Sequence, residues 1–331
     1  MKTTNYGVML AGASLLATSG LLADDVDDYI IAIQSDNDLY WGKGDEEYTN
    51  GQRANVSFPP GKEPDWLVPI VDWFPVVSEH KNRRYSITYG QSVFTPADIR
   101  RETVAENERA FAAYMYLGAG YADGGDYSTN LVNVNFGVVG DLARGRQAQK
   151  IIHSIKGSSA PIGWKNQLGN EAAVMVQYVH LWSGSQGSMF GGKYWDVTPH
   201  AGFSIGSPNT HVMAGTTFRI GTGIDREVGG LPLVQPQMAV HDIYQSDDRF
   251  AINFVAGFER RYVFYDLTLD TGIFQNGHSV NKFRKVGHFH VGFAAYWRKW
   301  RWGYSHVFEA KKYSTQPRKH HYGSFTISRY F

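Results

Sequence analysis

The sequence predicts an all-β protein, a transmembrane antiparallel β-barrel of about twelve strands with a short helix in one extracellular loop. Three observations support this fold class. Apolar and polar residues alternate along many segments, aromatic residues reach 15% while charged residues reach only 19%, and no apolar run beyond the N-terminus is long enough for a membrane helix. A membrane helix needs about 18 apolar residues, whereas the strands of a barrel need only alternate.

Composition excludes several classes of protein. The 331 residues carry a formal net charge of +1, so the basic excess typical of a nucleic-acid-binding protein is absent. The low charged fraction argues against disorder. There is no cysteine, which rules out disulfides, zinc–thiolate sites, cysteine nucleophiles and a lipoprotein anchor.

The N-terminus has the pattern of a secretory signal peptide. One charge, Lys2, precedes the apolar or small residues 8–23, and the segment 24–28, with four aspartates around Val26, follows abruptly. We expect a signal peptide over 1–23, cleaved after Ala23, and a single outer-membrane barrel domain over 24–331. A short buried helix is the alternative for residues 8–23.

Alternation along the strands indicates which face each residue takes. In 287–298, Phe289, Val291 and Phe293 alternate with His290 and Gly292. Such an apolar face would contact the core of a soluble sandwich or the lipid around a barrel. The final segment favours the barrel, because residues 322–331 form an amphipathic strand that ends in phenylalanine. Arg329 interrupts its apolar face, at a cost of only about 0–1 kcal/mol near a membrane interface.

An even number of strands places both ends of the barrel on the periplasmic side, and the connections after odd strands are then extracellular. Two periplasmic connections, 59–83 and 224–249, are longer than such barrels usually have. The predicted strands are 28–36, 48–58, 84–93, 110–121, 126–139, 168–184, 193–206, 211–223, 250–270, 287–298, 301–312 and 322–331.

Two extracellular segments carry candidate chemistry. Segment 36–53 is rich in the oxygen donors that hard cations prefer, although Tyr40 breaks the EF-hand pattern. A solvated polar loop is the alternative. Its carboxylates are Asp36, Asp38, Asp45, Glu46 and Glu47.

The second segment, 140–168, has helical character over 142–155. Asp141 is a candidate N-cap, and Gly157 and Pro161 are stop signals. Gln149 and His153 are four residues apart and share one face of this helix. A histidine there is either a general base or an ordinary loop residue.

Other reactive patterns have simpler explanations. Gly202–Gly206 matches the G-x-S-x-G motif around Ser204, but that motif requires a strand–turn–helix elbow and here lies within an alternating strand. His288 and His290 share a strand face, which suits either a metal or the polar lumen of a barrel.

Several motifs together resemble the LpxR-type lipid A 3-O-deacylases of Gram-negative outer membranes. Their order and spacing extend over nearly the whole mature chain. They are Asn37-Asp38, Tyr48–Gly51, Gly90-Gln91 with Thr95-Pro96, Asn107–Ala112, Gln149 with His153, Gly163-Trp164 with Gln167-Leu168 and Asn170-Glu171, Gly257–Glu259, and His278–Val280 through to Phe331.

The resemblance implies a calcium-dependent ester hydrolase whose site lies at the outer-leaflet rim, between the wall and a loop helix. Its reaction would be hydrolysis of the ester-linked 3′-acyloxyacyl chain of lipid A. His153 would activate water and Gln149 would support it. Asp38, Thr49 and Asn37 would hold Ca²⁺, which polarises the carbonyl. Strand parity places Asp38 and Thr49 inward and Asn37 on the lipid side.

The chain departs from the family pattern at two positions: Ser159 replaces a Glu found in some members, and Glu108 replaces an Asp. Candidates for a cation that binds the substrate phosphate are Arg100, Arg101 and Lys156. The expected partners are lipopolysaccharide and outer-membrane lipids, with the chain as a monomer and its active site facing the outer leaflet.

Two rival functions remain open at this stage. A passive pore or structural barrel would explain the alternation and the export signal, but not an oxygen-rich loop opposite a helical histidine loop. An outer-membrane phospholipase would need a serine beside His153, and the adjacent Ser154 points elsewhere on a helix.

Overall fold

A computed structural model describes residues 29–40, 46–75, 83–124, 127–156, 161–189, 192–226, 247–274 and 277–331. The expected signal peptide lies outside these residues and remains a prediction. Thirteen strands form one antiparallel sheet. They are β1 (Ile30–Asn37), β2 (Glu47–Ser57), β3 (Arg83–Thr95), β4 (Ala112–Gly124), β5 (Ser128–Val139), β6 (Glu171–Trp182), β7 (Gln186–Met189), β8 (Gly192–Gly206), β9 (Asn209–Gly221), β10 (Asp247–Asp266), β11 (Lys285–Arg298), β12 (Trp300–Glu309) and β13 (His320–Tyr330).

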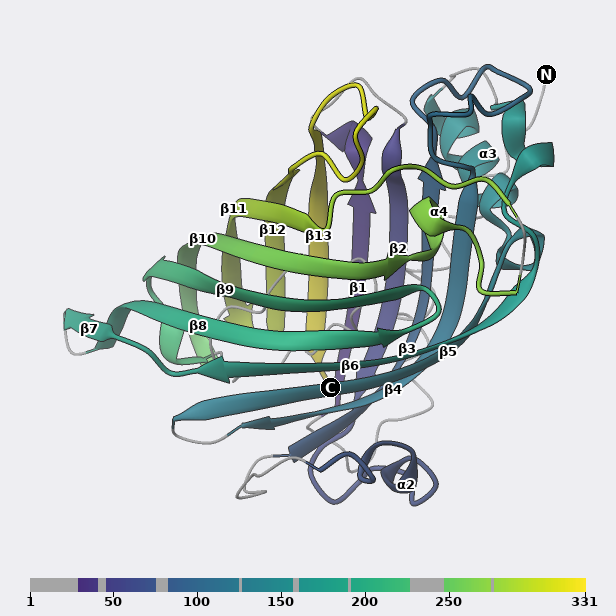
Figure 1. Cartoon of the computed structure of the whole chain (residues 1–331). Coiled ribbons are helices and arrows are strands. Elements are labelled where there is room, and N and C mark those ends of the chain that lie inside the picture. The colour runs from purple at the N-terminus through teal and green to yellow at the C-terminus, as the bar shows by residue number, and fades with distance from the viewer. Residues whose placement is uncertain are drawn as a thin grey trace, which may run out of the picture.

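The sheet closes on itself into a barrel (Figure 1). β1 pairs with both β2 and β13, and β6 pairs with both β5 and β8. The short β7 pairs with β8 alone, as a hairpin extension at one end of the wall. Twelve strands therefore form the closed antiparallel barrel that the sequence predicted, and β7 is an addition that alternation did not reveal because it is only four residues long.

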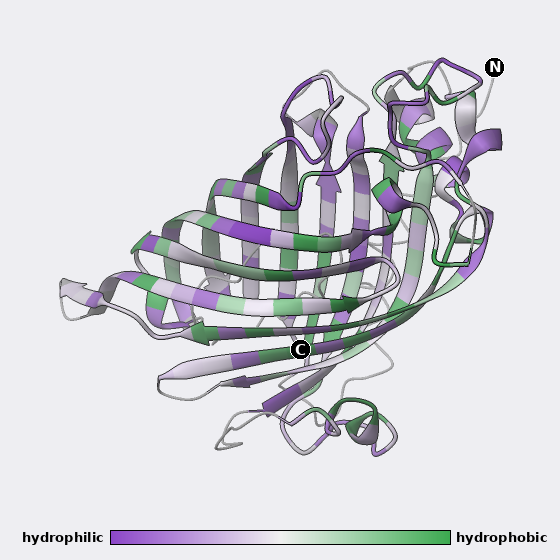
Figure 2. Cartoon of the chain, viewed as in Figure 1, coloured by the Kyte–Doolittle hydropathy of each residue, from purple (hydrophilic) through white to green (hydrophobic). Residues whose placement is uncertain are grey.

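The barrel is polar inside and apolar outside, as the alternation predicted. On β11 the side chains of Phe289, Val291 and Phe293 are exposed, while those of His288 and His290 are buried. Figure 2 shows hydrophilic and hydrophobic residues following one another along the strands. Exposed apolar side chains on one face, with polar ones buried on the other, give a wall that is stable when lipid surrounds it. Within the described residues, no helix has the length and apolar character to cross a membrane.

The two ends of the barrel differ in the connections that they carry. One end, called here the α3 end, bears η1 (Asp38–Tyr40), η2 (Asp141–Ala143), α3 (Gly145–Lys156), η3 (Gly163–Asn166) and α4 (Leu267–Asp270). The other, called the α2 end, bears α2 (Val68–Val71), β7 and η4 (Ile224–Arg226). Both the start of β1 and the end of β13 lie at the α2 end, because Ile30 is opposite Tyr330.

The long connection at the α2 end is packed against the outside of the wall. Leu67 and Val71 are fully buried in a cluster with Ala119, Tyr121 and Val132. These wall residues share the face of Leu117 and Phe136, whose side chains are exposed on the outer surface. Residues 58–75 therefore cover part of the face that strand parity assigns to lipid.

The predicted loop helix is present but begins later than expected. The chain first makes the 3₁₀ turn η2, and Arg144 then takes a left-handed conformation with φ 59° before α3 starts at Gly145. Asp141 does not cap the helix, and its carboxylate instead accepts a hydrogen bond from Gln167 Nε2 at 3.1 Å. The break at Arg144 separates the predicted N-cap from the helix. Gly157, the predicted stop, lies outside the described residues.

Candidate functional site

The buried face of α3 is polar. Gly145, Gln149 and His153 are four residues apart and buried, whereas Gln147, Lys150 and Ser154 are exposed. Gln149 is 1% exposed and His153 is 2% exposed. A surface helix usually buries an apolar stripe, so a buried amide and imidazole at this spacing make this face the candidate site.

Contacts of Gln91, Ala113 and Trp164 hold α3 close against the wall, and we call these three residues the seat of α3. Trp164 Nε1 donates to Gln149 Oε1 at 2.6 Å, and Gln91 Nε2 on β3 donates to the carbonyl oxygen of Ala143 at 2.7 Å. A Cβ at Gly145 would lie 2.5 Å from the Trp164 ring and 2.6 Å from Ala113 Cβ. Glycine therefore allows the helix to approach β4 more closely than any other residue would.

The seat lies on the outer face of the barrel. Trp164 packs with Val93, Ala113 and Ala143. Val93 and Ala113 are opposite each other on β3 and β4, and they share the parity of the exposed Leu117. The loop that carries His153 thus folds over the outside of the wall at the α3 end, not into the lumen.

The same level of the outer face is polar on β1 and β2. Asn50 is opposite Val93 on one side and opposite Asn37 on the other. Gln52 Nε2 donates to Asn50 Oδ1 at 2.9 Å and to Ser35 Oγ at 2.8 Å. Neighbouring strands are roughly 4.8 Å apart, so Asn37 lies about 10 Å along the wall from the seat of α3. We call Ser35, Asn37, Asn50 and Gln52 the outer polar row.

Most carboxylates of segment 36–53 have structural partners. Asp36 points into the lumen and pairs with Arg53, Glu46 pairs with Arg318, and Glu47 pairs with Arg109. Asp45 lies outside the described residues. Asp38 is 3% exposed, and its Oδ2 accepts a hydrogen bond from the backbone nitrogen of Glu46 at 3.0 Å. The carboxylates of Asp36, Glu46 and Glu47 are therefore held in ion pairs with arginines.

Thr49 lies at a bulge in β2. Tyr48 is opposite Phe94 and Asn50 is opposite Val93, so Thr49 is the extra residue between them. Bulges re-aim side chains, and the Thr49 hydroxyl lies 2.7 Å from that of Thr95 on β3. Asp38 has left β1 for η1. Strand parity predicted that Asp38 and Thr49 point inward, but parity does not fix the direction of a side chain in a 3₁₀ turn or at a bulge. Asn37 lies in the regular part of β1 and keeps the outward parity predicted for it.

The predicted calcium ligands fit a hard cation in their chemistry. Asn37, Asp38 and Thr49 supply amide, carboxylate and hydroxyl oxygens, and all three are at most 4% exposed. Oxygen donors of these kinds are those that calcium prefers, with water completing the shell. Among the described residues, no group of three or more His, Asp or Glu side chains is arranged to hold a metal. A metal at this rim would therefore rest on the mixed oxygen donors rather than on a carboxylate cluster.

Arg109 fastens the loops of the α3 end to one another. Its guanidinium pairs with Glu47 at 2.6 Å and also donates to Thr268 Oγ1 in α4. Glu47 in turn accepts from the Tyr313 hydroxyl at 2.7 Å. Burial alone would lower the pKa of Arg109, but the carboxylates of Glu47 and Asp266 outweigh it and raise that pKa. For the neutral Tyr313 phenol burial has the opposite sign and raises the pKa. Arg109 is thus a permanently charged structural link.

Other sequence candidates do not share the buried face of α3. Ser204 lies in β8, and its hydroxyl donates to the backbone oxygen of Asn209 at 3.1 Å, so no nucleophile elbow exists there. His288 and His290 are buried in the lumen. Ser154 is exposed on α3 and donates to its own helix at Ile151.

The candidate cations for a substrate phosphate remain predictions. Arg100 is exposed, and Arg101 pairs with Asp98 on the surface at 3.1 Å. Lys156 is the last residue of α3. Ser159 lies outside the described residues.

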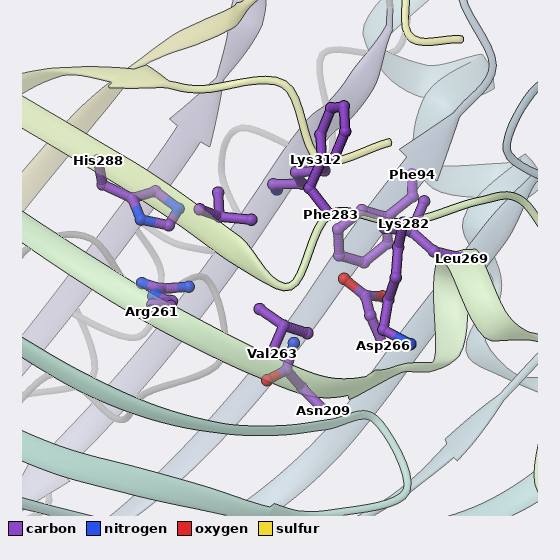
Figure 3. A pocket seen from close by; sticks show the side chains of 11 residues that line it. Phe94, Asn209, Arg261, Val263, Asp266, Leu269, Lys282, Phe283, His288 and Lys312 are labelled. Atoms are coloured by element: carbon purple, nitrogen blue, oxygen red, sulfur yellow. The ribbon is translucent and has the colours of Figure 1, made fainter. Parts of the chain in front are cut away.

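A recess on the lumen side is lined by side chains that include Asn209, Arg261 and His288 (Figure 3). Its cationic side chains each have a carboxylate partner. Arg261 pairs with Glu259, Lys282 with Asp270, and Lys312 with Glu309. The recess contains none of the predicted site residues, so we do not place the site there.

Sequence reasoning missed the residues that shape the site without being reactive. Gln52 and Gly145 fall into this group, whereas Asn50 and Trp164 were found as parts of the family motifs but without a role in the site. One signal was present: Ser35, Asn37, Asn50 and Gln52 are polar at positions where parity predicts lipid-facing apolar residues. The contact of Trp164 with Gln149 had no local signal, because it depends on how the loop folds back.

Comparisons with known proteins agree with this architecture. LpxR from Salmonella typhimurium superimposes with a TM-score of 0.74 at 18% identity, covering 91% of this chain and 100% of that one. The NalP translocator domain from Neisseria meningitidis gives 0.38 at 12% identity over 98% and 95% of the two chains, which is too low to support an argument. A search of curated proteins gives no significant match.

The sequence itself identifies the family. Residues 8–331 match the family described as outer membrane protein LpxR, which is almost the whole chain. The match confirms the resemblance found from the motifs and is consistent with a barrel of the outer membrane. This chain therefore belongs to the LpxR family.

Proposed function

We propose that this protein hydrolyses the ester that attaches the 3′-acyloxyacyl chain to lipid A. One observation carries the proposal: the polar face of α3, with Gln149 and His153 buried, is seated on the outer face of the barrel beside the outer polar row. A site on the outer wall is open to a lipid that arrives sideways within the leaflet. The ester of an acylated sugar lies between its polar and apolar parts, which is the level of a barrel rim.

His153 is the proposed general base. A neutral imidazole can take a proton from water near neutral pH, which makes the water oxygen nucleophilic toward the ester carbonyl. The proton would later be returned to the sugar oxygen that leaves. This route requires no serine nucleophile, in keeping with the exposed, helix-bonded hydroxyl of Ser154.

Gln149 is the proposed donor to the substrate. The Trp164 N–H holds Gln149 Oε1, which leaves the two amide hydrogens on Nε2. Gln149 Nε2 is buried and has no hydrogen-bond partner among the residues that the structure describes. A buried donor of this kind is costly unless a water or ligand satisfies it. Its position one turn before His153 suits an ester oxygen or the oxyanion that develops from it.

Calcium is the proposed cofactor. Asp38, Thr49 and Asn37 would hold it through their oxygens, and when bound it would supply positive charge that stabilises the oxyanion. The chain's own residues do the remaining work. His153 moves the proton, Gln149 donates to the ester oxygen, and the outer polar row contacts the sugar.

Mass spectrometry of lipid A and phospholipids from cells that express the protein tests the proposal. We expect loss of the 3′-acyloxyacyl chain from lipid A, with phospholipids unchanged. Released fatty acid from phospholipids with lipid A intact would instead support a phospholipase. Unmodified lipids together with single-channel conductance would support a pore.

A further inference from the structure

The connection at the α2 end presents two tryptophan side chains away from the wall. Trp66 is 59% exposed and Trp73 is 60% exposed, whereas Leu67 and Val71 between them are fully buried. The indole N–H of Trp73 donates to the carbonyl oxygen of Ile70 at 2.7 Å. Residues 58–75, called here the α2 segment, thus have a buried apolar side, with Leu67 and Val71, and an outer side that exposes the two tryptophan rings together with Lys62, Asp65 and Asp72.

The inner side of the α2 segment covers wall that would otherwise face lipid. Its neighbours Ala119 and Tyr121 on β4 are opposite Val134 and Val132 on β5, all with outward parity. Phe74 packs on the ring of Tyr178 with centroids 5.5 Å apart. Just beyond the covered area, Leu117, Phe136 and Val174 are exposed on the same face. The covered area is therefore continuous with the apolar belt.

A polar network marks where the apolar belt ends. Asp72 accepts hydrogen bonds from the Tyr85 hydroxyl at 2.9 Å and from Arg83 at 2.9 Å, and Arg83 also pairs with Asp123 at 2.9 Å. These groups join the α2 segment to the ends of β3 and β4. Trp66 and Trp73 therefore lie close to the boundary between apolar wall and charged rim, the level at which membrane proteins place aromatic belts.

We infer that the α2 segment is a membrane-interface anchor, and that its partner is the lipid of the leaflet opposite the candidate site. Trp66 and Trp73 insert their rings at the headgroup level, and lipid contacts the α2 segment in place of the covered wall. Indole rings suit this level because they combine a large apolar surface with one polar N–H. The apolar belt above and the charged network below favour a lipid interface over a protein partner.

The anchor also acts on the wall that carries the candidate site. α3 packs on β3 and β4, while α2 packs on β4 and β5. β4 therefore has the catalytic loop at one end and the anchor at the other. Fixing one end of β4 at a membrane interface sets the depth at which the other end meets the opposite leaflet.

Fluorescence quenching in lipid vesicles tests the anchor. The purified barrel is inserted in phosphatidylcholine vesicles with or without bromine on the acyl chains, and iodide is added as an aqueous quencher. The fluorescence of the Trp66→Phe and Trp73→Phe variants is subtracted from that of the parent protein, which gives the emission of each indole separately. Trp297→Phe is the matched control, because Trp297 is 48% exposed on the outer face of β11.

We expect brominated lipid to quench Trp66 and Trp73 about as strongly as Trp297, with little quenching by iodide. Strong iodide quenching without bromine quenching would overturn the inference. Protection that disappears as the protein is diluted with lipid would also overturn it, by pointing to a second copy of the chain. No substrate enters the measurement, so the outcome is independent of the proposed deacylation.

Discussion

Two connections fold back onto the outside of this barrel, and they are built on opposite principles. The α2 segment covers its wall with Leu67 and Val71, which are apolar and fully buried. The loop with α3 covers its wall partly with Gln149 and His153, which are polar and buried as deeply. Burying apolar groups stabilises the fold, whereas burying polar ones costs free energy unless they are bonded. The α2 covering therefore stabilises the fold by apolar burial, whereas the α3 covering buries polar side chains to which we assign a chemical role.

If the two coverings differ in this way, the largest effect on the rate of deacylation is expected from a substitution of His153 in the α3 covering. His153→Ala should lower the rate of lipid A deacylation by roughly 10²–10⁴-fold, the usual contribution of a general base. His153→Asn should not restore activity, because an amide does not take a proton from water. The rate is measured by mass spectrometry of purified substrate, with heat-modifiable migration on gels as the check that the barrel is folded.

Ser154→Ala is the matched control for His153. Ser154 is the next residue on α3 but is exposed, and its hydroxyl bonds to Ile151. We expect the parent rate. A parent rate in His153→Ala, or a lost rate in Ser154→Ala, would contradict the proposed mechanism.

The second prediction concerns calcium at the rim beside α3. Chelation should abolish deacylation and added calcium should restore it. Asp38→Ala should raise the calcium concentration required by at least about 10–100-fold, the cost typical of losing even an indirect metal contact. The measurement is the rate as a function of free calcium.

Glu46→Gln is the control that distinguishes loss of a calcium ligand at Asp38 from a general disturbance of the connection between β1 and β2. Glu46 is in the same connection, but its carboxylate pairs with Arg318. This variant should keep the calcium response of the parent. Full activity of the parent in excess chelator would rule out the cofactor.

A third prediction tests the close seat of α3. Gly145→Ala introduces a Cβ that would lie 2.6 Å from Ala113 Cβ, so the helix must shift outward. Overpacking of this kind costs about 1–3 kcal/mol, and we expect deacylation to fall roughly tenfold although alanine is the better helix former. Gln147→Ala, at an exposed position of the same helix, should leave the rate unchanged. Equal rates for the two variants would show that the seat does not position His153.

The smallest effect on activity is expected at the α2 covering. Leu67→Ala should reduce stability by about 2–5 kcal/mol, as for other buried leucines. In detergent, the rate per folded molecule should stay at the parent value. Loss of the folded form is followed by heat-modifiable migration over a denaturant series, and Asp65→Ala, at an exposed position, is the control. If Leu67→Ala lowers the rate of deacylation while the barrel remains folded, the α2 covering is not purely structural and the proposed difference between the two coverings is wrong.

Much of the fold could be predicted because its signals are local. Alternation with a period of two follows from the strand backbone itself, so exposed Phe289 and buried His290 could be assigned from the sequence. The helical period likewise placed Gln149 and His153 on one face before any contact was known. Four-residue β7 and the left-handed Arg144 were missed, because short elements leave too few residues for a period to be seen.

The sequence by itself determined the class of barrel, the inward and outward faces of its strands, and the candidate residues for the proposed chemistry. Only the tertiary structure decided how those residues sit against the wall. The Gln91 bond to Ala143 and the contact of Thr49 with Thr95 join residues 52 and 46 positions apart. Which of the neighbouring carboxylates form ion pairs also depended on the fold, as for Asp36 with Arg53 and Glu46 with Arg318. Local periods fix the direction of a side chain within its own element, but contacts between distant segments depend on how the loops fold back onto the wall.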